Sequence, residues 1–221
     1  MNTRQRFGVA AALVAISGVV SVLAWPSLPE QLITHWNAAG EPDGTMAKLP
    51  GLALIPALSA LLLGLFAALP RIDPLGENVE SFRAAYDWFV VVFTAFMAAL
   101  QTGIVAFNLG YRFDFTLFIL VAVAALFYYI GILLDVVERN WFVGIRTPWT
   151  LSSEEVWDRT HRLGARLFKL TAVVALAGLL FGDYAVYFLV VPAVVTALAT
   201  VAYSYYVYEQ LDSDAATETA L

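Results

Sequence analysis

The apolar residues of the chain fall into six long stretches separated by shorter polar segments. These stretches cover residues 7–25, 51–69, 85–107, 115–137, 167–181 and 184–208. A helix needs about 20 apolar residues to cross the hydrocarbon core of a bilayer, and most of the six are long enough. The fifth is the shortest, but its helix can begin earlier, in the charged segment 153–166. The pattern predicts an all-α integral membrane protein, a bundle of about six transmembrane helices.

The first stretch has a second interpretation, as a secretory signal. Arg4 and Arg6 precede it, and it ends near Ala24 at small residues that permit cleavage. A signal core, however, has only about 7–15 apolar residues, and this stretch is longer. We therefore expect a retained first span.

Composition agrees with a membrane protein and excludes several other classes. Hydrophobic residues make up 61% of the chain and charged residues 14%, whereas a soluble domain has roughly 45–50% and about 25%. The formal net charge of −6 gives no basic stripe for direct nucleic-acid binding. The chain has no cysteine, which excludes disulfides, thiolate metal sites and a cysteine nucleophile. We expect a multi-pass protein of the cell membrane whose main partner is the lipid bilayer.

The distribution of Lys and Arg predicts the orientation. If the spans alternate, ten of these residues lie on one side: Arg4, Arg6, Arg71, Arg83, Arg139, Arg146, Arg159, Arg162, Arg166 and Lys169. Only Lys48 and Arg112 lie on the other side. The positive-inside rule then places both termini in the cytoplasm, segment 26–50 outside and segment 138–166 inside.

Three regions follow from this topology. Residues 1–84 contain the first two spans and the outer loop, residues 85–208 contain four spans and the inner loop, and residues 209–221 form an acidic tail. Within the spans, Gln101, Thr102 and Asn108 are the nearest approach to a polar path, and we expect them to form interhelical hydrogen bonds instead.

The outer segment is rich in turn-forming residues. Asn37, Gly40 and the run from Pro42 to Gly44 favour tight reversals, so we expect a folded loop. His35 with Glu41 and Asp43 has the residue types for a metal or pH-sensing site. One histidine and two carboxylates are a thin basis for metal binding, and we predict no metal site. The candidate partner-binding residues here are His35, Trp36, Asn37 and Asp43.

The inner segment contains a predicted helix start. Ser152 and Glu155 have the spacing of a capping box, and Glu155–Arg159 and Asp158–Arg162 are ion pairs four residues apart. Arg146 lies between an isoleucine and a Thr-Pro-Trp run in this interfacial loop. Its guanidinium is expected to be held by a carboxylate (Asp87, Asp135 or Glu138) or by lipid phosphate, the alternative being a simple headgroup anchor. The inner candidates are Arg146, Thr147, Pro148, Trp149, Trp157 and His161.

These two segments carry a family resemblance. Residues 140–162, with the core Gly-Ile-Arg-Thr-Pro-Trp-Thr-Leu followed by Trp157 and Thr-His-Arg, resemble the SdpI family of membrane immunity proteins. The outer His-Trp-Asn, Gly and Pro-Asp-Gly pattern is similar to the small domain of unknown function that commonly precedes the SdpI region, with Ile33–Thr34 where that domain often has isoleucine and proline. The resemblance implies an immunity and signalling protein that meets a secreted toxic peptide outside and a transcriptional repressor inside.

Three function classes remain to be compared. A non-enzymic binding protein without a cofactor fits the two opposed loops best. A membrane enzyme is disfavoured because His35 and His161 lie on opposite sides of the membrane and because catalytic motifs such as Gly-x-Ser-x-Gly and His-Glu-x-x-His are absent from the sequence. A small transporter is disfavoured because the spans have no mid-membrane charges and no evident inverted repeat.

Overall fold

Six long helices form the body of the molecule. The computed structural model describes the backbone of residues 1–219 and the side chains through Asp214. The long helices are α1 (Thr3–Ala24), α2 (Lys48–Ile72), α4 (Arg83–Asn108), α5 (Phe115–Leu134), α7 (Glu154–Gly178) and α8 (Tyr187–Thr219). Within the described residues, six helical segments, one in each of these regions, are long and apolar enough to span a membrane. The predicted six-span membrane architecture is confirmed.

Short elements connect the long helices. They are the 3₁₀ turns η1 (Trp25–Ser27) and η2 (Leu179–Tyr184), the helices α3 (Gly76–Ser81) and α6 (Pro148–Ser152), and the strands β1 (Gln31–Trp36) and β2 (Pro42–Ala47). The outer segment, expected to be a folded loop with tight reversals, is an antiparallel hairpin. This hairpin is the one strand-containing element in the otherwise helical described chain. Helix α8 continues through most of the predicted acidic tail, whose residues 220–221 lie outside the described chain.

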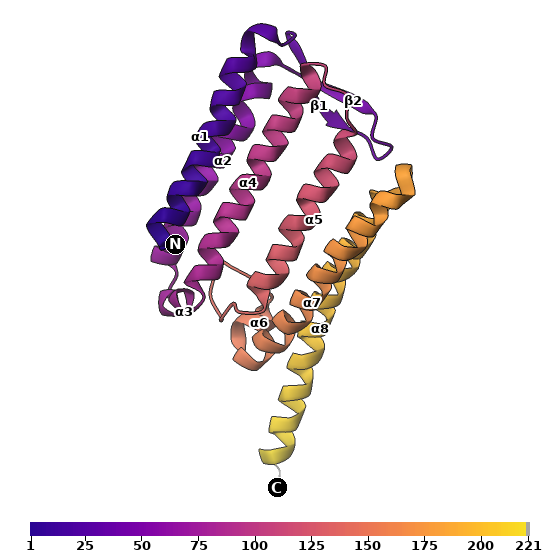
Figure 1. Ribbon diagram of the computed structural model, residues 1–221. Helices are drawn as coiled ribbons and strands as arrows, with labels where there is room; N and C mark the ends of the chain where they lie inside the picture. Colours follow the sequence, from indigo (N-terminus) through magenta and orange to yellow (C-terminus); the bar gives the residue numbers. More distant parts are fainter. Residues whose placement is uncertain (220–221) are drawn as a thin grey trace.

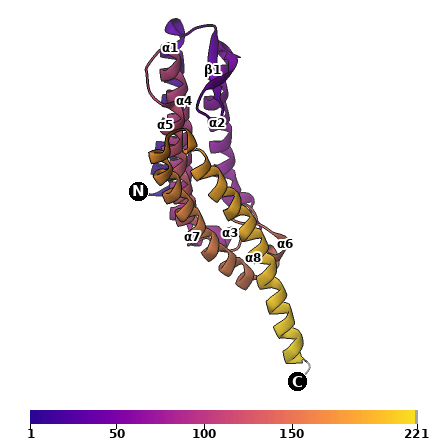
Figure 2. The same cartoon turned by 90° about the vertical axis from the view of Figure 1, so that its right-hand side faces the viewer.

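The helices stand in a row rather than in a round bundle (Figure 1). Helices α1 and α2 pack on α4, α4 lies beside α5, and α7 joins α5 to α8. The view turned by 90° shows that the assembly is thin in the second direction (Figure 2). The hairpin covers one end of the long helices, whereas α3, α6 and both termini lie toward the opposite end of these helices. The two loops with candidate residues thus lie at opposite ends of the molecule.

Small and polar residues allow the helices to approach closely. A Cβ atom on Gly131 of α5 would lie 2.6 Å from Lys169 Cγ and 2.8 Å from the carbonyl oxygen of Ala165, both on α7. Gln101 on α4 donates to Ser21 Oγ on α1 at 2.7 Å and to the Leu52 carbonyl on α2 at 3.3 Å. Helix association in lipid depends on such close contacts and interhelical hydrogen bonds. The prediction for Gln101 is confirmed.

The other two polar residues of that helix behave differently. Thr102 is exposed and donates to the Ala98 carbonyl of its own helix, so the predicted interhelical bond is wrong there. Asn108 instead holds the hairpin: its side chain accepts from the Ile33 amide at 2.8 Å and donates to the Ile33 carbonyl at 2.9 Å. A side-chain amide can satisfy one residue of an edge strand in this way, because it offers both a donor and an acceptor.

The end of the molecule that carries the hairpin and the end that carries both termini should be accessible from opposite compartments. The wild type has no cysteine, so single cysteines can be introduced directly. Thr45→Cys on β2 should react with a membrane-impermeant maleimide in intact cells, and Ser152→Cys at the end of α6 only after permeabilisation; both side chains are exposed. The reverse labelling pattern would show that the charge-based orientation is wrong.

Candidate functional site

The outer site begins with the turn between the two strands. Asn37 Oδ1 accepts from the amides of Ala39 at 2.9 Å and Glu41 at 3.0 Å, and Gly40 adopts a φ of +81°. A Cβ atom on Gly40 would also lie 3.1 Å from Thr116 Oγ1 at the start of α5. Side-chain bonds from Asn to the following backbone and glycine at positive φ are typical of tight turns. Asn37, predicted to bind a partner, thus orders the turn.

His35 and Asp43 form an exposed pair on neighbouring strands. His35 Nδ1 and Asp43 Oδ1 are 2.5 Å apart, with 71% and 43% of the two side chains exposed. Gly44 makes room for this pair, because a Cβ atom there would lie 2.9 Å from His35 Cβ. Glu41 turns instead to Asn37 Nδ2, at 3.3 Å. The described residues contain no group of three or more metal-ligating side chains.

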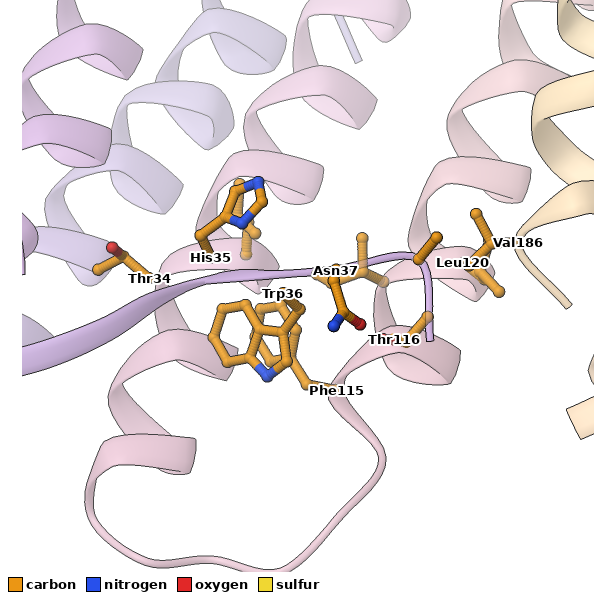
Figure 3. Close-up of a pocket in the computed structure, with 11 residues that line it drawn as sticks. Thr34, His35, Trp36, Asn37, Phe115, Thr116, Leu120 and Val186 are labelled. Carbon is orange, nitrogen blue, oxygen red and sulfur yellow. The ribbon is translucent and has the colours of Figure 1, made fainter. Parts of the chain in front are cut away.

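Trp36 anchors the tip of the hairpin to the helix ends. Its ring stacks on Phe115 of α5 with centroids 3.6 Å apart and planes 10° apart, and it meets Phe107 of α4 edge-on at 5.2 Å. Its indole Nε1 is buried and has no hydrogen-bond partner among the described residues. Because β1 alternates its side chains, His35 and Trp36 point to opposite faces of the strand (Figure 3).

A cavity of about 470 Å³ lies beside Trp36. Figure 3 shows its polar rim, with Thr34, His35 and Asn37 from the hairpin and Thr116 from α5. Its walls are apolar and come from Leu100, Phe115, Ile119, Leu120 and Val186. Sequence reasoning did not find these wall residues, since they belong to three apolar segments far apart in the chain. The outer site can therefore receive an apolar group beneath a polar rim.

The inner site is a compact loop closed by its own asparagine. Asn140 is fully buried; its Oδ1 accepts from the amides of Phe142 and Val143 at 2.9 and 2.6 Å. Its Nδ2 donates to the carbonyls of Glu138 and Val143 at 2.9 and 2.8 Å. Sequence reasoning missed this role. The available signal was an asparagine at the start of this loop, because Asn often bonds to nearby backbone.

Trp157 and His161 on α7 are buried under this loop and form hydrogen bonds to its backbone. Trp157 is fully buried, donates through Nε1 to the Val137 carbonyl at 2.9 Å, and stacks on His161 with ring centroids 4.0 Å apart. His161 Nδ1 donates to the Trp157 carbonyl at 2.7 Å, and Nε2 accepts from the Ile145 amide at 2.9 Å. This arrangement requires the neutral imidazole with its proton on Nδ1. Both ring nitrogens are thus engaged within the fold.

Thr147 and Pro148 begin the short helix α6. Thr147 Oγ1 accepts from the Thr150 amide at 3.1 Å, Thr150 Oγ1 accepts from the Thr147 amide at 2.9 Å, and Pro148 follows the cap. Thr147 also bonds to Ser204 of α8 at 3.2 Å, and the Trp149 ring lies 5.0 Å from that of Tyr205. These contacts attach the inner loop to the last helix.

The predicted capping box at Ser152 and Glu155 is wrong. Ser152 is the last residue of α6, and its hydroxyl donates back to the Trp149 carbonyl at 3.0 Å. The N-cap of α7 is Ser153, whose Oγ accepts from the Val156 amide at 3.4 Å.

The predicted Glu155–Arg159 pair is present at 2.5 Å. The Asp158–Arg162 pair is not within ion-pair distance in the described chain, so that prediction is wrong.

Arg146 is exposed and bonds to backbone rather than to a carboxylate. Its Nη1 donates to the Trp141 carbonyl at 2.9 Å, and it has no carboxylate partner among the described residues. Two of the carboxylates predicted to hold it pair with closer cations. Asp87 pairs with Arg83 at 2.7 Å and Arg6 at 3.6 Å, and Asp135 pairs with Lys169. The predicted carboxylate contact of Arg146 is wrong.

Three residues outside the predicted set connect the inner loop to the first half of the chain. Asp73, at the end of α2, accepts from the Trp141 amide at 3.0 Å, and Asn78 of α3 donates to the Arg139 carbonyl at 2.8 Å. Arg139 in turn donates to the Leu151 carbonyl at 2.9 Å. No local pattern indicates these pairings, because 68 residues separate Asp73 from Trp141 and 61 separate Asn78 from Arg139.

The fold and these two sites define a multi-pass membrane protein with a hairpin-capped apolar cavity at one end and a preorganised loop at the other. Residues 136–204 match the SdpI/YfhL protein family, and residues 12–60 match the domain of unknown function DUF1648. The chain is also 22% identical over 201 residues to "Immunity protein SdpI" of Bacillus subtilis (strain 168), covering 90% of this chain and 94% of that protein. The resemblance seen in the sequence is thus confirmed, at the same two segments that carried it.

The comparisons also bear on role and location. Similarity to an immunity protein along nearly the whole chain supports a membrane immunity role, and with the six apolar helices it supports a multi-pass membrane location. No solved structure matches this chain. The SdpI/YfhL match contains the inner loop, α6, α7 and about the first half of α8, and the DUF1648 match contains the hairpin.

Proposed function

We propose that this chain protects its cell by binding a toxic peptide at the outer hairpin, and that its inner loop binds a cytoplasmic regulator. The observation that carries the outer part is the cavity of about 470 Å³ beside Trp36. An apolar cavity with a few polar groups at its rim is the usual form of a ligand site. It lies at the end expected to face outward, where an incoming peptide meets it without crossing the membrane.

The hairpin is built to hold its position over that cavity. Leu32 is fully buried and packs against Gly51 of α2, Asn108 of α4 bonds both backbone groups of Ile33, and Trp36 stacks on Phe115 of α5. One two-stranded element thus contacts three helices. An isolated hairpin is marginally stable, and these three attachments supply the missing stability. Preorganisation of this kind lowers the entropy lost on binding.

Charge beside the cavity favours a cationic peptide. Glu41 and Asp43 are exposed at the hairpin end, and Asp114 lies at the neighbouring start of α5. His35, which lines the cavity, pairs through Nδ1 with Asp43, and in the neutral imidazole its second ring nitrogen, Nε2, is an acceptor. A peptide with an apolar side chain next to a lysine or arginine would place the first in the cavity and the second on Asp43.

For the inner partner, the exposed residues matter most. Arg146 and Trp141 are both exposed and are joined by the bond from the guanidinium to the Trp141 carbonyl. Arg and Trp are enriched among residues that dominate protein interfaces. Trp157 and His161 support the loop from inside, so their proposed part in partner binding is indirect. A cytoplasmic transcriptional repressor is the proposed partner of this surface.

The test is growth of a toxin-sensitive strain that expresses matched amounts of each variant while exposed to the toxic peptide. Wild type should protect, and Asp43→Asn should raise sensitivity about tenfold, because a hydrogen bond or ion pair to a charged group contributes about that factor to affinity. His35→Ala should weaken protection less. Thr45→Ala, on an exposed neighbouring position of the same hairpin, is the matched control and should protect like wild type.

Two results would contradict the proposal. If wild type protects against no toxic peptide, the immunity function fails for this chain. If wild type protects and Asp43→Asn protects equally well, the peptide does not bind at this rim. Co-sedimentation of the cytoplasmic partner with membranes should be unchanged in Asp43→Asn, since the inner loop lies at the opposite end of the molecule.

A further inference from the structure

A small cavity between α7 and α8 brings basic side chains together near the terminal end. It has a volume of about 220 Å³ and is lined by Arg159, Arg162, Leu163, Arg166 and Tyr203. The first four residues occupy positions i, i+3, i+4 and i+7, so they share one face of α7. Tyr203 comes from α8, which packs along α7. Neither the outer hairpin nor the inner loop contributes to this cavity.

Two of the three guanidiniums there lack a counter-charge. Arg159 is paired with Glu155 at 2.5 Å. Arg162 and Arg166 are exposed and have neither an ion pair nor a hydrogen bond within the described part of the chain. Lys169, one turn further on, is already paired with Asp135. Asp158 and Glu138 line a neighbouring cavity with Arg162 but form no ion pair with it. Two neighbouring guanidiniums without an ion pair can bind an anion that accepts from both planar forks, as phosphate does.

The surroundings place the arginines at the depth of lipid headgroups. Four tyrosines, Tyr203, Tyr205, Tyr206 and Tyr208, follow one another on α8 at this level, and Trp149 packs on Tyr205. Aromatic residues with a polar tip concentrate at the membrane interface. Toward the hairpin end, α7 and α8 expose large apolar side chains, including Leu170 at 57%, Val173 at 55% and Leu198 at 67%. This surface can accommodate acyl chains.

We propose that Arg162 and Arg166 bind the phosphate of an anionic phospholipid, with Tyr203 beside the headgroup and the acyl chains along the apolar surface of α7 and α8. The combination of unpaired cations with an adjoining exposed apolar surface distinguishes a lipid from a free phosphate ion, which would use only the arginines. The lipid attaches α7 and α8 to the inner leaflet and fixes the helix pair that supports the inner loop.

The test uses the full-length protein in neutral detergent micelles, titrated separately with phosphatidylglycerol, phosphatidylcholine and inorganic phosphate. Bound lipid is measured by native mass spectrometry and its effect by the thermal unfolding midpoint. Phosphatidylglycerol should bind and raise the midpoint more than phosphatidylcholine. Arg162→Gln/Arg166→Gln should weaken phosphatidylglycerol binding by about tenfold or more, since charge-assisted hydrogen bonds to phosphate are removed.

A matched control separates this site from general attraction to basic surface. Arg4→Gln/Arg71→Gln removes the same charge from two exposed positions, one at the start of α1 and one at the end of α2. This double variant should retain wild-type binding. Arg162→Lys/Arg166→Lys keeps the charge, so it should fold if the glutamine variant does not, and it should bind more weakly than wild type because it lacks the planar fork. Equal binding of the two lipids, equal loss in the control, or equally tight binding of inorganic phosphate would each overturn the proposal.

Discussion

Gly144→Ala should destabilise the protein by about 3 kcal/mol, a large loss for the addition of one methyl group. Gly144 has a φ of +119°, where an L-residue is strained by on the order of 1–3 kcal/mol. The new Cβ would also lie 2.5 Å from His161 Nε2 and 3.2 Å from the Trp157 ring. The loop would have to move away, and the Ile145 amide would lose its bond to His161, which adds about 1 kcal/mol.

Gly110→Ala is the matched control, because it isolates backbone strain. Gly110 has a φ of +90°, similarly unfavourable for alanine, but a Cβ atom there has no neighbour within 4 Å among the described residues. It should therefore lower the thermal unfolding midpoint in detergent clearly less than Gly144→Ala does. If the two variants lower it equally, the close packing of Gly144 on His161 contributes nothing beyond strain.

The spans could be predicted because the bilayer imposes a length on every apolar stretch. The six predicted stretches overlap the six long helices, and errors occur only at the ends. The hairpin was missed for a different reason. Its strands have six residues each, and β1 does not alternate apolar and polar residues cleanly. Its order depends on Asn108 and Phe115, which lie about 75 residues away, so a local pattern cannot reveal it.

The inner site shows the same division between local and distant information. The turn around Thr147 and Pro148 and the Glu155–Arg159 pair are local, and the residues involved could be recognised as part of a structured segment. The N-cap of α7 lies one residue later than predicted, at Ser153, because Ser152 is the last residue of α6. For Arg146 the sequence leaves a carboxylate, lipid phosphate and a headgroup anchor open, because three carboxylates lie near the same face. The choice among these partners depends on side-chain packing that only the fold determines.

Trp36→Ala should have the largest effect on function, because this one side chain joins the hairpin tip to two helices and borders the cavity. The substitution removes the stack on Phe115 and the edge contact with Phe107. Truncation of a packed tryptophan costs on the order of 3 kcal/mol, and here the loss falls on the attachment of the hairpin. We expect faster limited proteolysis of residues 31–47, loss of the cavity wall and loss of protection against the toxic peptide.

Trp36→Phe separates packing from hydrogen bonding at the same position. It keeps an aromatic ring over Phe115 and removes the buried indole N–H that lacks a partner in the described structure. Because an unpaired buried donor is unfavourable, this variant should be as resistant to proteolysis as wild type and should still protect. Loss of protection in Trp36→Phe with an intact hairpin would mean that the indole N–H binds the peptide directly. Full protection by Trp36→Ala would contradict the proposal that the hairpin and its cavity form the peptide site.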